Sequence, residues 1–233
     1  MTFFLQSNKK QLVISRYEEN IDWIENVAVN FDDIIVYNKG KSSFNKKSEK
    51  IKEQKLPNIG RESHSFLHHI IQNYDNINKY AYLVFSQSDP FDHCSRFMEL
   101  VNNRDNYSSK PFYFIRESND KFVFYYEPIE ITHPNGLPLV NFYYHIFCDE
   151  QIEKLPQSRN SLMIIPVKNI KFRSVDFYKH LLNFVNKSEN PLEGYILERL
   201  WIPIFDGVTK DWFTHYNEYK RKFLGVWKNI PIT

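Results

Sequence analysis

Short apolar runs alternate with amphipathic stretches along the first hundred residues of the chain. Three of these runs have the length and composition of buried strands: 11–17 (QLVISRY), 33–37 (DIIVY) and 80–86 (YAYLVFS). Between them, apolar residues at helical spacing predict helices over 20–27 and about 62–74. This alternation predicts a mostly parallel central sheet that is flanked by helices.

The pattern changes after about residue 105. Aromatic or apolar runs predict strands at 112–116, 122–126, 142–147 and 161–167. Helical spacing predicts helices over 176–185 and 192–205, the second ending near Pro203. No repeat or linker separates the two parts. We therefore expect one α/β domain over 1–233, with halves at about 1–105 and a mixed region at about 106–233.

Composition is that of a globular protein, with 42% hydrophobic and 25% charged residues. The formal net charge of +2 is too small to indicate nucleic acid as a partner. The densest basic segment is 39–55, which contains seven lysines and few apolar residues. It predicts a solvated loop, with a flexible lid over an anionic ligand as the alternative.

Cysteine usage and hydropathy bear on location. Cys94 and Cys148 lack metal-type spacing, and we expect both to be reduced and buried. No apolar run reaches the roughly 18 residues that a membrane span needs. The sequence predicts a soluble, cytoplasmic protein without a transmembrane segment, and leaves peripheral membrane association open.

Polar residues follow the predicted early strands, where parallel sheets bind ligands. The strongest cluster is NIGRE at 58–62, just before a predicted helix. Gly60 permits a tight turn, Arg61 offers a planar donor fork, and a helix N-terminus attracts phosphate. Asn58 can contact a base or ribose. The alternative is an ordinary helix start in which Glu62 complements the dipole.

Two carboxylates follow the third strand, in QSDPFDH at 87–93. Asp89 and Asp92 could hold Mg²⁺ or Mn²⁺ beside a diphosphate, because these cations prefer oxygen ligands. Their D-x-x-D spacing differs from the usual D-x-D. The alternative is a proline-containing turn in which Asp92 caps the next helix.

Histidines offer a different chemistry. His64 and His68 are four residues apart on a predicted helix, and His93 follows the next strand. A pair at this spacing can bind zinc, although the glutamate of an H-E-x-x-H motif is replaced by Ser65. The alternative is packing against the sheet.

A late helix carries a candidate base. Glu198 lies among apolar neighbours, which can raise the pKa of a carboxylate and suit it to accept a proton. Glu193 is about 140° away around the helix, so the two carboxylates do not form a close pair. The alternative for Glu198 is a surface ion pair with Arg199 or a lysine.

Four segments carry a resemblance to a known family: ISRYEE at 14–19, VYNKG at 36–40, LPNIGRESH at 56–64 and YILERLW at 195–201. With LHHI at 67–70 and DH at 92–93 they resemble a domain family of unknown function that is similar to GT-A glycosyltransferases. The resemblance spans about residues 12–205. Related polysaccharide enzymes carry an Asn-x-Gly-Arg-Asp/Glu turn like that at 58–62.

The resemblance implies a GT-A-like domain in which residues 1–105 bind a nucleotide-sugar donor and 106–233 bind a glycan or lipid-linked glycan acceptor. Glu198 would deprotonate the acceptor hydroxyl in an inverting displacement of polysaccharide biosynthesis, and Asp89 and Asp92 would take the place of the metal motif. The implied donor-binding residues are Ser15, Arg16, Tyr17, Glu18, Asn38, Lys39, Asn58, Gly60, Arg61, His64 and Gln87.

Two other classes of function stay open. A metal-dependent hydrolase would use His64, His68 and His93 with a carboxylate. A non-catalytic nucleotide- or glycan-binding module would leave Glu198 structural. Serine hydrolases, P-loop kinases and dinucleotide oxidoreductases lack support, because G-x-S-x-G, P-loop and G-x-G-x-x-G motifs are missing.

Overall fold

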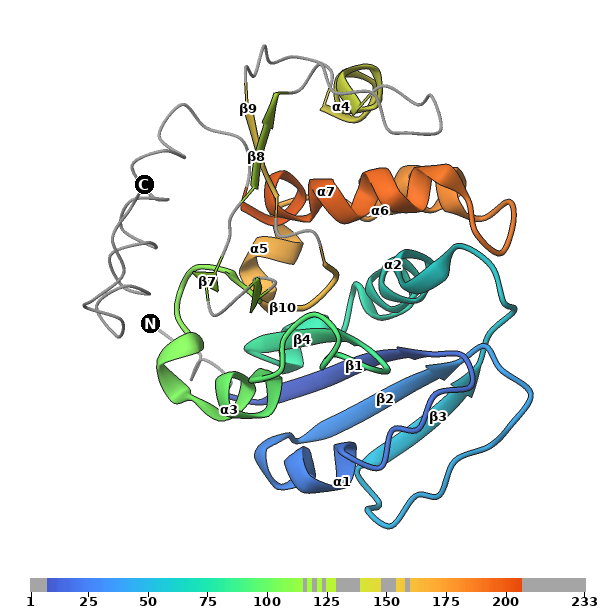
Figure 1. Cartoon of the computed structure of the whole chain (residues 1–233), viewed down its shortest axis with the longest axis vertical. Helices are drawn as coiled ribbons and strands as arrows, with labels where there is room; N and C mark the ends of the chain where they lie inside the picture. Colours follow the sequence, from blue (N-terminus) through green and yellow to red (C-terminus); the bar gives the residue numbers. More distant parts are fainter. Residues whose placement is uncertain are drawn as a thin grey trace.

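A six-stranded mixed sheet lies at the centre of the protein, in the order β3-β2-β1-β4-β10-β5 (Figure 1). The computed structural model describes residues 8–114, 117–118, 121–122, 125–128, 139–147, 154–157 and 160–206. The strands are β1 (Lys10–Arg16), β2 (Asp33–Asn38), β3 (Ile51–Lys55), β4 (Tyr82–Gln87), β5 (Phe112–Tyr113) and β10 (Met163–Pro166). The expected α/β class is confirmed.

The first four strands of the sheet run parallel, and the last two pairings are antiparallel. In the middle of the sheet, Ile14 of β1 is paired with Val36 on one side and Ser86 on the other. Strand β10 pairs antiparallel with both β4 and β5. Because β10 comes from the C-terminal half of the chain, the two predicted halves share one sheet.

Helices cover both faces, because successive strand residues point to opposite sides. Leu12 and Ile14 pack with helices α1 (Ile24–Val27) and α3 (Phe97–Asn102). Val13 packs on the other face with α2 (Arg61–Asn73), α6 (Val175–Val185) and α7 (Leu192–Asp206). Figure 1 shows the two helix layers on either side of the sheet.

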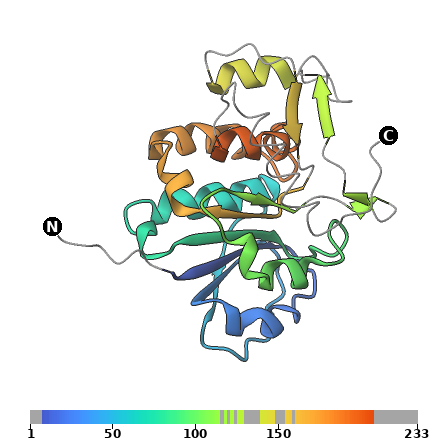
Figure 2. The same cartoon turned by 90° about the vertical axis from the view of Figure 1, so that its left-hand side faces the viewer.

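Smaller elements complete the fold. Figure 2 shows α4 and the β8–β9 pair beyond the α6–α7 layer, away from the sheet. These elements are α4 (Leu139–Phe147), α5 (Val167–Lys171), β6 (Glu117–Ser118), β7 (Lys121–Phe122), β8 (Tyr125–Pro128), β9 (Lys154–Gln157), η1 (Ala28–Asn30), η2 (Ile77–Lys79) and η3 (Arg104–Asn106).

The prediction of a strand at 142–147 is wrong, because this segment belongs to helix α4. Leu139, Phe142, Tyr143 and Ile146 are all buried, at the i, i+3, i+4, i+7 spacing of one helix face. Burial of one aromatic side chain contributes about 2 kcal/mol, whereas strand propensity differences span only about 1 kcal/mol. Packing of this stripe therefore outweighs the strand preference of its residues.

The lysine-rich segment is not entirely loop, because its end forms strand β3. Ile51 is paired with Ile34 of β2 and is the one buried residue of the strand. Lysines and other polar side chains are typical of edge strands, which they protect from pairing with other chains. A strand with one apolar residue lacks the alternating pattern that would have revealed it.

Other element boundaries differ in detail. Strand β5 covers only the start of the predicted 112–116, and the region predicted as one strand at 122–126 contains the last residue of β7 and the first two residues of β8. The first predicted helix is shorter than expected, since α1 begins at Ile24. Helix α7 continues through Pro203 to Asp206, and residues 200–205 are buried throughout.

Cys94 is buried, as expected, and forms no disulfide within the described part of the chain, whereas Cys148 lies outside that part. Among the helices that the structure describes, none combines the length and apolar character needed to cross a membrane.

Replacing Phe85 tests the core on the α2 side of the sheet. Phe85 of β4 is fully buried, and its ring lies 4.9 Å from that of Phe66. Phe85→Ala should lower the free energy of unfolding by roughly 3–5 kcal/mol, because it leaves a cavity. Phe172→Ala is the control: this side chain is 68% exposed, and the change should stay within about 0.5 kcal/mol. Urea denaturation measures both, and equal effects would contradict this packing.

Candidate functional site

The loops that follow β1 and β2 are tied together by Arg16. This side chain is buried, and its Nε donates a hydrogen bond to the carbonyl of Glu19 at 2.9 Å. Its Nη1 and Nη2 donate to the carbonyl and hydroxyl of Ser42, at 2.9 and 3.0 Å. All three guanidinium nitrogens therefore have acceptors within the protein, and Arg16 holds the two loops together.

Glu18 and Asn38 complete this junction. The Glu18 carboxylate accepts hydrogen bonds from the hydroxyl of Ser42 and, at 2.5 Å, from the backbone N–H of Lys41. The bond from Ser42 is the main reason that the pKa of Glu18 lies below its ordinary value. Asn38 is fully buried; it donates to the Ser42 carbonyl at 2.8 Å and accepts from the Gly40 N–H at 2.9 Å.

Gly40 allows the two loops to touch. A Cβ at this position would lie 1.8 Å from the carbonyl oxygen of Tyr17. The loop after β2 is held again at Lys47, whose N–H donates to Glu25 at 2.7 Å. These contacts anchor the lysine-rich segment against the β1 side, an arrangement that does not favour a freely moving lid. The Tyr17 side chain is 47% exposed beside this junction.

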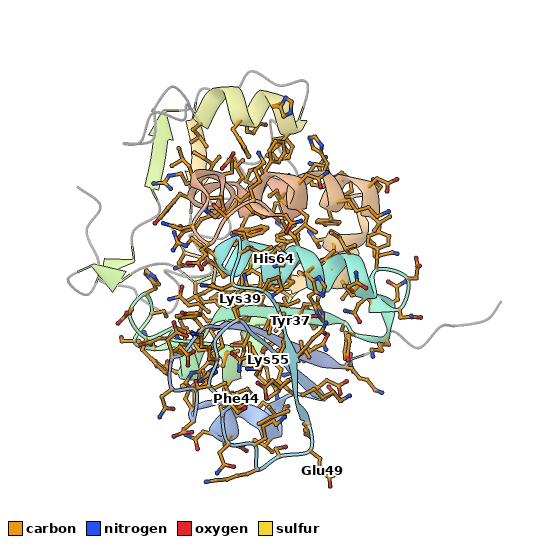
Figure 3. The ribbon with its side chains drawn as sticks, turned by 90° about the vertical axis from the view of Figure 1, so that its right-hand side faces the viewer. Tyr37, Lys39, Phe44, Glu49, Lys55 and His64 are labelled. Carbon is orange, nitrogen blue, oxygen red and sulfur yellow. The ribbon has the colours of Figure 1, made fainter. Side chains whose placement is uncertain are left out.

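Lys39 connects the β2 loop to the start of α2. Its side chain is buried, and the ammonium group donates to the carbonyls of Ile59, at 2.5 Å, and Arg61. Burial lowers the pKa of Lys39 to about 8, and the negative charge of Glu62 partly opposes this shift. Lys39 and His64 lie close together in Figure 3. The ammonium therefore lies at the N-terminal end of α2.

The turn before α2 has an unusual backbone. Gly60 and Arg61 have positive φ angles of 65° and 49°. At a residue other than glycine this conformation costs about 1–2 kcal/mol. The Gly60 N–H donates to the carbonyl of Ser188 at 2.8 Å, and a Cβ on Gly60 would lie 2.6 Å from the Val185 carbonyl. Close packing against the end of α6 therefore requires glycine here.

The Arg61 side chain crosses to α7. Its guanidinium lies over the ring of Tyr195, 4.2 Å from the centroid, and its Nε is 3.6 Å from a Glu62 oxygen. Nη1 of Arg61 is buried and has no hydrogen-bond partner among the described residues. A buried donor without an acceptor is uncommon in native proteins. The side chain as a whole is 32% exposed, so the guanidinium can still donate hydrogen bonds to an anionic ligand.

Three sources of positive charge converge at this edge: Lys39, Arg61 and the N-terminus of α2. We call them the cationic cluster. Among the described residues, no hydrogen-bond partner is present for the N–H groups of Glu62 and Ser63 in the first turn of α2. The Ser63 hydroxyl is also buried without a partner in that part of the chain. Free N–H groups and two cations are what a phosphate group prefers.

Glu198 lies on α7, one turn after Tyr195, and is partly buried. Residues three apart share a helix face, so this carboxylate lies on the side of α7 that Arg61 covers. Its charge also acts on Arg199, whose pKa is lowered by burial and partly restored by Glu198. This interaction agrees with the alternative of a pair with Arg199 and leaves the role of Glu198 a prediction.

The loop after β4 lies beside the β1 loop. Trp23 donates from Nε1 to the Ser88 carbonyl at 2.8 Å. Gln87 donates to the carbonyl of Asp89 at 2.6 Å, and Asp89 accepts from the Phe91 N–H at 3.1 Å. The loop is therefore held mainly by bonds to its own backbone.

Asp89 and Asp92 do not form a recognisable metal site. Asp92 is exposed, and Asp89 is engaged with backbone in its own turn. Within the described ranges, no three His, Cys, Asp or Glu side chains are grouped so that they could hold a metal ion. The described residues do not fit a resident cation, and the predicted Mg²⁺ or Mn²⁺ stays a prediction.

The histidines are mainly packed. The rings of His64 and His68 stack with centroids 6.1 Å apart. Burial, with the charge of Lys39, lowers the pKa of His64 to about 4. In the part of the chain that the structure describes, His64, His68 and His93 belong to no group of three that could bind a metal. The geometry gives the hydrolase alternative no support.

Two further predicted residues occupy different surroundings. Ser15, at the end of β1, is buried and lies 2.9 Å from the hydroxyl of Ser65 on α2. Asn58 is partly exposed in the turn between β3 and α2. Ser15 therefore joins helix to sheet, whereas Asn58 lies two residues before Gly60 in the turn that leads into α2.

Similarity to known proteins was found only for the N-terminal part of the chain. A family model described as "Protein of unknown function (DUF3431)" matches residues 12–107. The chain resembles that family there. No curated protein and no solved structure matches the chain. The matched region includes Lys39 and Arg61 and ends before α7, so Glu198 lies outside it.

Sequence reasoning missed three residues around the cationic cluster. Tyr195 supports the Arg61 guanidinium, and Ser161 donates to Glu62 at 3.1 Å while accepting from Trp201 at 3.2 Å. These contacts join α2 to the segment just before β10 and to α7, and Glu62 and Ser161 are 99 residues apart in sequence. No local pattern could have shown them.

Two glycine substitutions test how closely the site is packed. Gly40→Ala should lower the free energy of unfolding by more than about 2 kcal/mol, because its Cβ meets the Tyr17 backbone. Gly194→Ala in α7 is the matched control, since the nearest atom to its Cβ is 3.8 Å away. It should be neutral or gain up to about 1 kcal/mol. Thermal and urea unfolding measure both, and a tolerated Gly40→Ala would contradict the junction.

Proposed function

We propose that this protein is a glycosyltransferase that moves a sugar from a nucleotide-sugar donor to a glycan or polysaccharide acceptor with inversion. One observation carries the proposal: Lys39, Arg61 and the free N–H groups of α2 converge at the carboxyl edge of a parallel β-sheet. Ligands of open α/β sheets bind at this edge. The proposal includes a GT-A-like donor half at about 1–105 and an acceptor half at about 106–233.

The cationic cluster suits the diphosphate of the donor. When the sugar is transferred, the bond between its anomeric carbon and the diphosphate oxygen breaks, and the diphosphate gains negative charge. Cations and backbone N–H groups that are already in place stabilise this charge. The Arg61 side chain is 32% exposed, so its guanidinium would donate to a phosphate oxygen. In this scheme Arg16, Glu18 and Asn38 position the loops around the donor.

Glu198 is the proposed base. Its carboxylate would take the proton of the acceptor hydroxyl as that oxygen forms the new bond to the anomeric carbon, while the diphosphate leaves with the electron pair. Support comes from its place on α7, one turn from the Tyr195 ring that holds Arg61. The acceptor would then lie between α7 and the donor.

Charge neutralisation is assigned to Lys39 and Arg61, and no step is assigned to a metal ion. In the alternative case, the carboxylates of Asp89 and Asp92 would bind an Mg²⁺ or Mn²⁺ ion that arrives together with the donor. Adding and omitting Mn²⁺ in the binding assay separates these two cases.

Nucleotide binding tests the donor site. UDP, GDP, CDP, CMP and dTDP are each added at saturating concentration, with and without Mn²⁺, and the melting temperature is recorded. A ligand at about 100 times its Kd adds about 2.7 kcal/mol of stability, which corresponds to roughly 5–10 °C here. We expect at least one nucleotide to produce such a shift. The absence of any shift would remove the donor site.

Lys39→Met and Arg61→Met should each weaken binding of the retained nucleotide at least about tenfold, since a charge-assisted hydrogen bond contributes about 1.5–3 kcal/mol. Lys179→Met is the control, because Lys179 is exposed on α6 and pairs with Asp176 at 2.9 Å. It should bind as the native protein does. Equal losses in all three variants would place the nucleotide elsewhere.

Glu198→Gln tests the base. Release of nucleoside diphosphate from the matching nucleotide sugar, with a panel of glycan acceptors, should fall about 10²–10⁴-fold while nucleotide affinity stays the same. Glu193 lies on the same helix as Glu198 and is 3.6 Å from Lys187, which precedes that helix. The Glu193→Gln variant should keep its turnover. Unchanged turnover in Glu198→Gln removes it from the mechanism. Nucleotide binding by the native protein without turnover on any acceptor favours the binding-module alternative.

A further inference from the structure

Glu62 places a carboxylate inside the cationic cluster. One of its oxygens lies 3.6 Å from Nε of Arg61, and its charge acts on Lys39. The Glu62 side chain is only 12% exposed. A carboxylate at this position repels an incoming phosphate, so its presence there calls for a physical reason.

The Glu62 carboxylate is held by a chain of two hydrogen bonds from the C-terminal half of the protein. Ser161 donates a hydrogen bond to its Oε1 at 3.1 Å, and Trp201 donates from Nε1 to the Ser161 hydroxyl at 3.2 Å. Ser161 and Trp201 are both buried. Ser161, which lies just before β10, and Trp201 of α7 therefore fix the direction of Oε1, and Oε2 is the oxygen that lies near Arg61.

The other charged and titratable groups around Lys39 do not stabilise its ammonium. On α2 these are Arg61 and two histidines; the pKa values of His64 and His68 are lowered by burial and, in addition, by the positive charge of Lys39. On β3, Lys55 donates to the Gly40 carbonyl at 3.0 Å, and after β1 Glu18 is bound to Ser42. Glu62 is the carboxylate whose charge favours the protonated form of Lys39.

We propose that Glu62 is a positioning residue of the anion site: its carboxylate, fixed by Ser161 and Trp201, is the internal counter-ion of Lys39 and Arg61 and holds the Arg61 guanidinium in place for a diphosphate. This inference rests on the proposed function, since it describes how the same site binds its donor. Glu62 itself makes no contact with the donor. Without the Glu62 carboxylate, the buried ammonium of Lys39, which lies beside a guanidinium and a helix N-terminus, would lose its proton more readily.

The proposal has a definite pH dependence. The pKa of Lys39 is about 8, so its positive charge is present below that pH and is lost as the pH rises through it. Anion binding by the native protein should therefore weaken as the pH rises through about 8. Removing Glu62 lowers the pKa of Lys39 further, which moves this loss of binding to lower pH. At pH 6 Lys39 is charged in both proteins, and the variant lacks the repelling carboxylate.

Calorimetric titration between pH 6 and 9 tests this inference, with inorganic pyrophosphate and the retained nucleoside diphosphate as ligands. Glu62→Gln should bind as tightly as the native protein, or more tightly, at pH 6. At pH 8 its affinity should be about fivefold weaker, which is the loss of charged Lys39 expected there for a downward shift of about one pKa unit from about 8. Ser161→Ala should move the pH midpoint in the same direction by less. Glu193→Gln, a carboxylate variant outside the cluster, should leave the midpoint in place.

A double-mutant cycle separates action through Lys39 from a structural effect. In the Lys39→Met background the fall in affinity around pH 8 should disappear, apart from the change caused by ionisation of the ligand's own phosphates, and adding Glu62→Gln should then cause no further loss of affinity. If Glu62→Gln fails to fold, Ser161→Ala carries the same test. An unchanged midpoint in both variants, or equal losses with and without Lys39, overturns the inference.

The two proposals fail differently. Native protein that binds pyrophosphate with the expected pH shift in Glu62→Gln, but binds none of the nucleotides, supports the role of Glu62 and refutes the nucleotide-sugar donor. Nucleotide binding with no change in Glu62→Gln refutes only the role of Glu62. Native protein that binds neither ligand refutes both.

Discussion

The buried ammonium group of Lys39 is the interaction on which the carboxyl edge of the sheet depends. It bonds to the carbonyls of Ile59 and Arg61 and so joins the loop after β2 to the turn that begins α2. A buried cation requires acceptors in fixed positions, because its desolvation is otherwise too costly. The turn at Gly60 and Arg61, with its two positive φ angles, presents those carbonyls.

Around this interaction, close contacts between backbones set the shape of the edge. Gly40 lets the β2 loop lie against Tyr17, and Gly60 lets the start of α2 lie against the end of α6. The Ser15–Ser65 contact brings α2 near β1 with small side chains. Because these contacts involve backbone atoms, the loops around the cationic cluster are positioned by packing before any ligand binds. Such preorganisation favours stabilisation of a charge that develops during a reaction.

Polar groups from the C-terminal half complete the cluster. Tyr195 covers the Arg61 guanidinium, and the Trp201–Ser161–Glu62 chain of hydrogen bonds reaches the same point from α7 and β10. The family match covers only residues 12–107, so these partners come from beyond the matched region. Donor and acceptor sites in the proposed function would therefore be coupled through side chains of α7.

The sequence by itself determined the presence and parallel arrangement of the strands β1, β2 and β4, the helix α2 and the turn at 58–62. Each of these carries its own local signal, either a continuous apolar run, a helical stripe or a glycine before a cap. Only the tertiary structure decided three other features: the polar edge strand β3, the aromatic helix α4 and the antiparallel entry of β10 beside β4. Their conformations depend on which surface they pack against, which a local pattern does not record. The same reason applies to the cluster, since Glu62 and Ser161 meet across about 100 residues of chain and no spacing rule connects them.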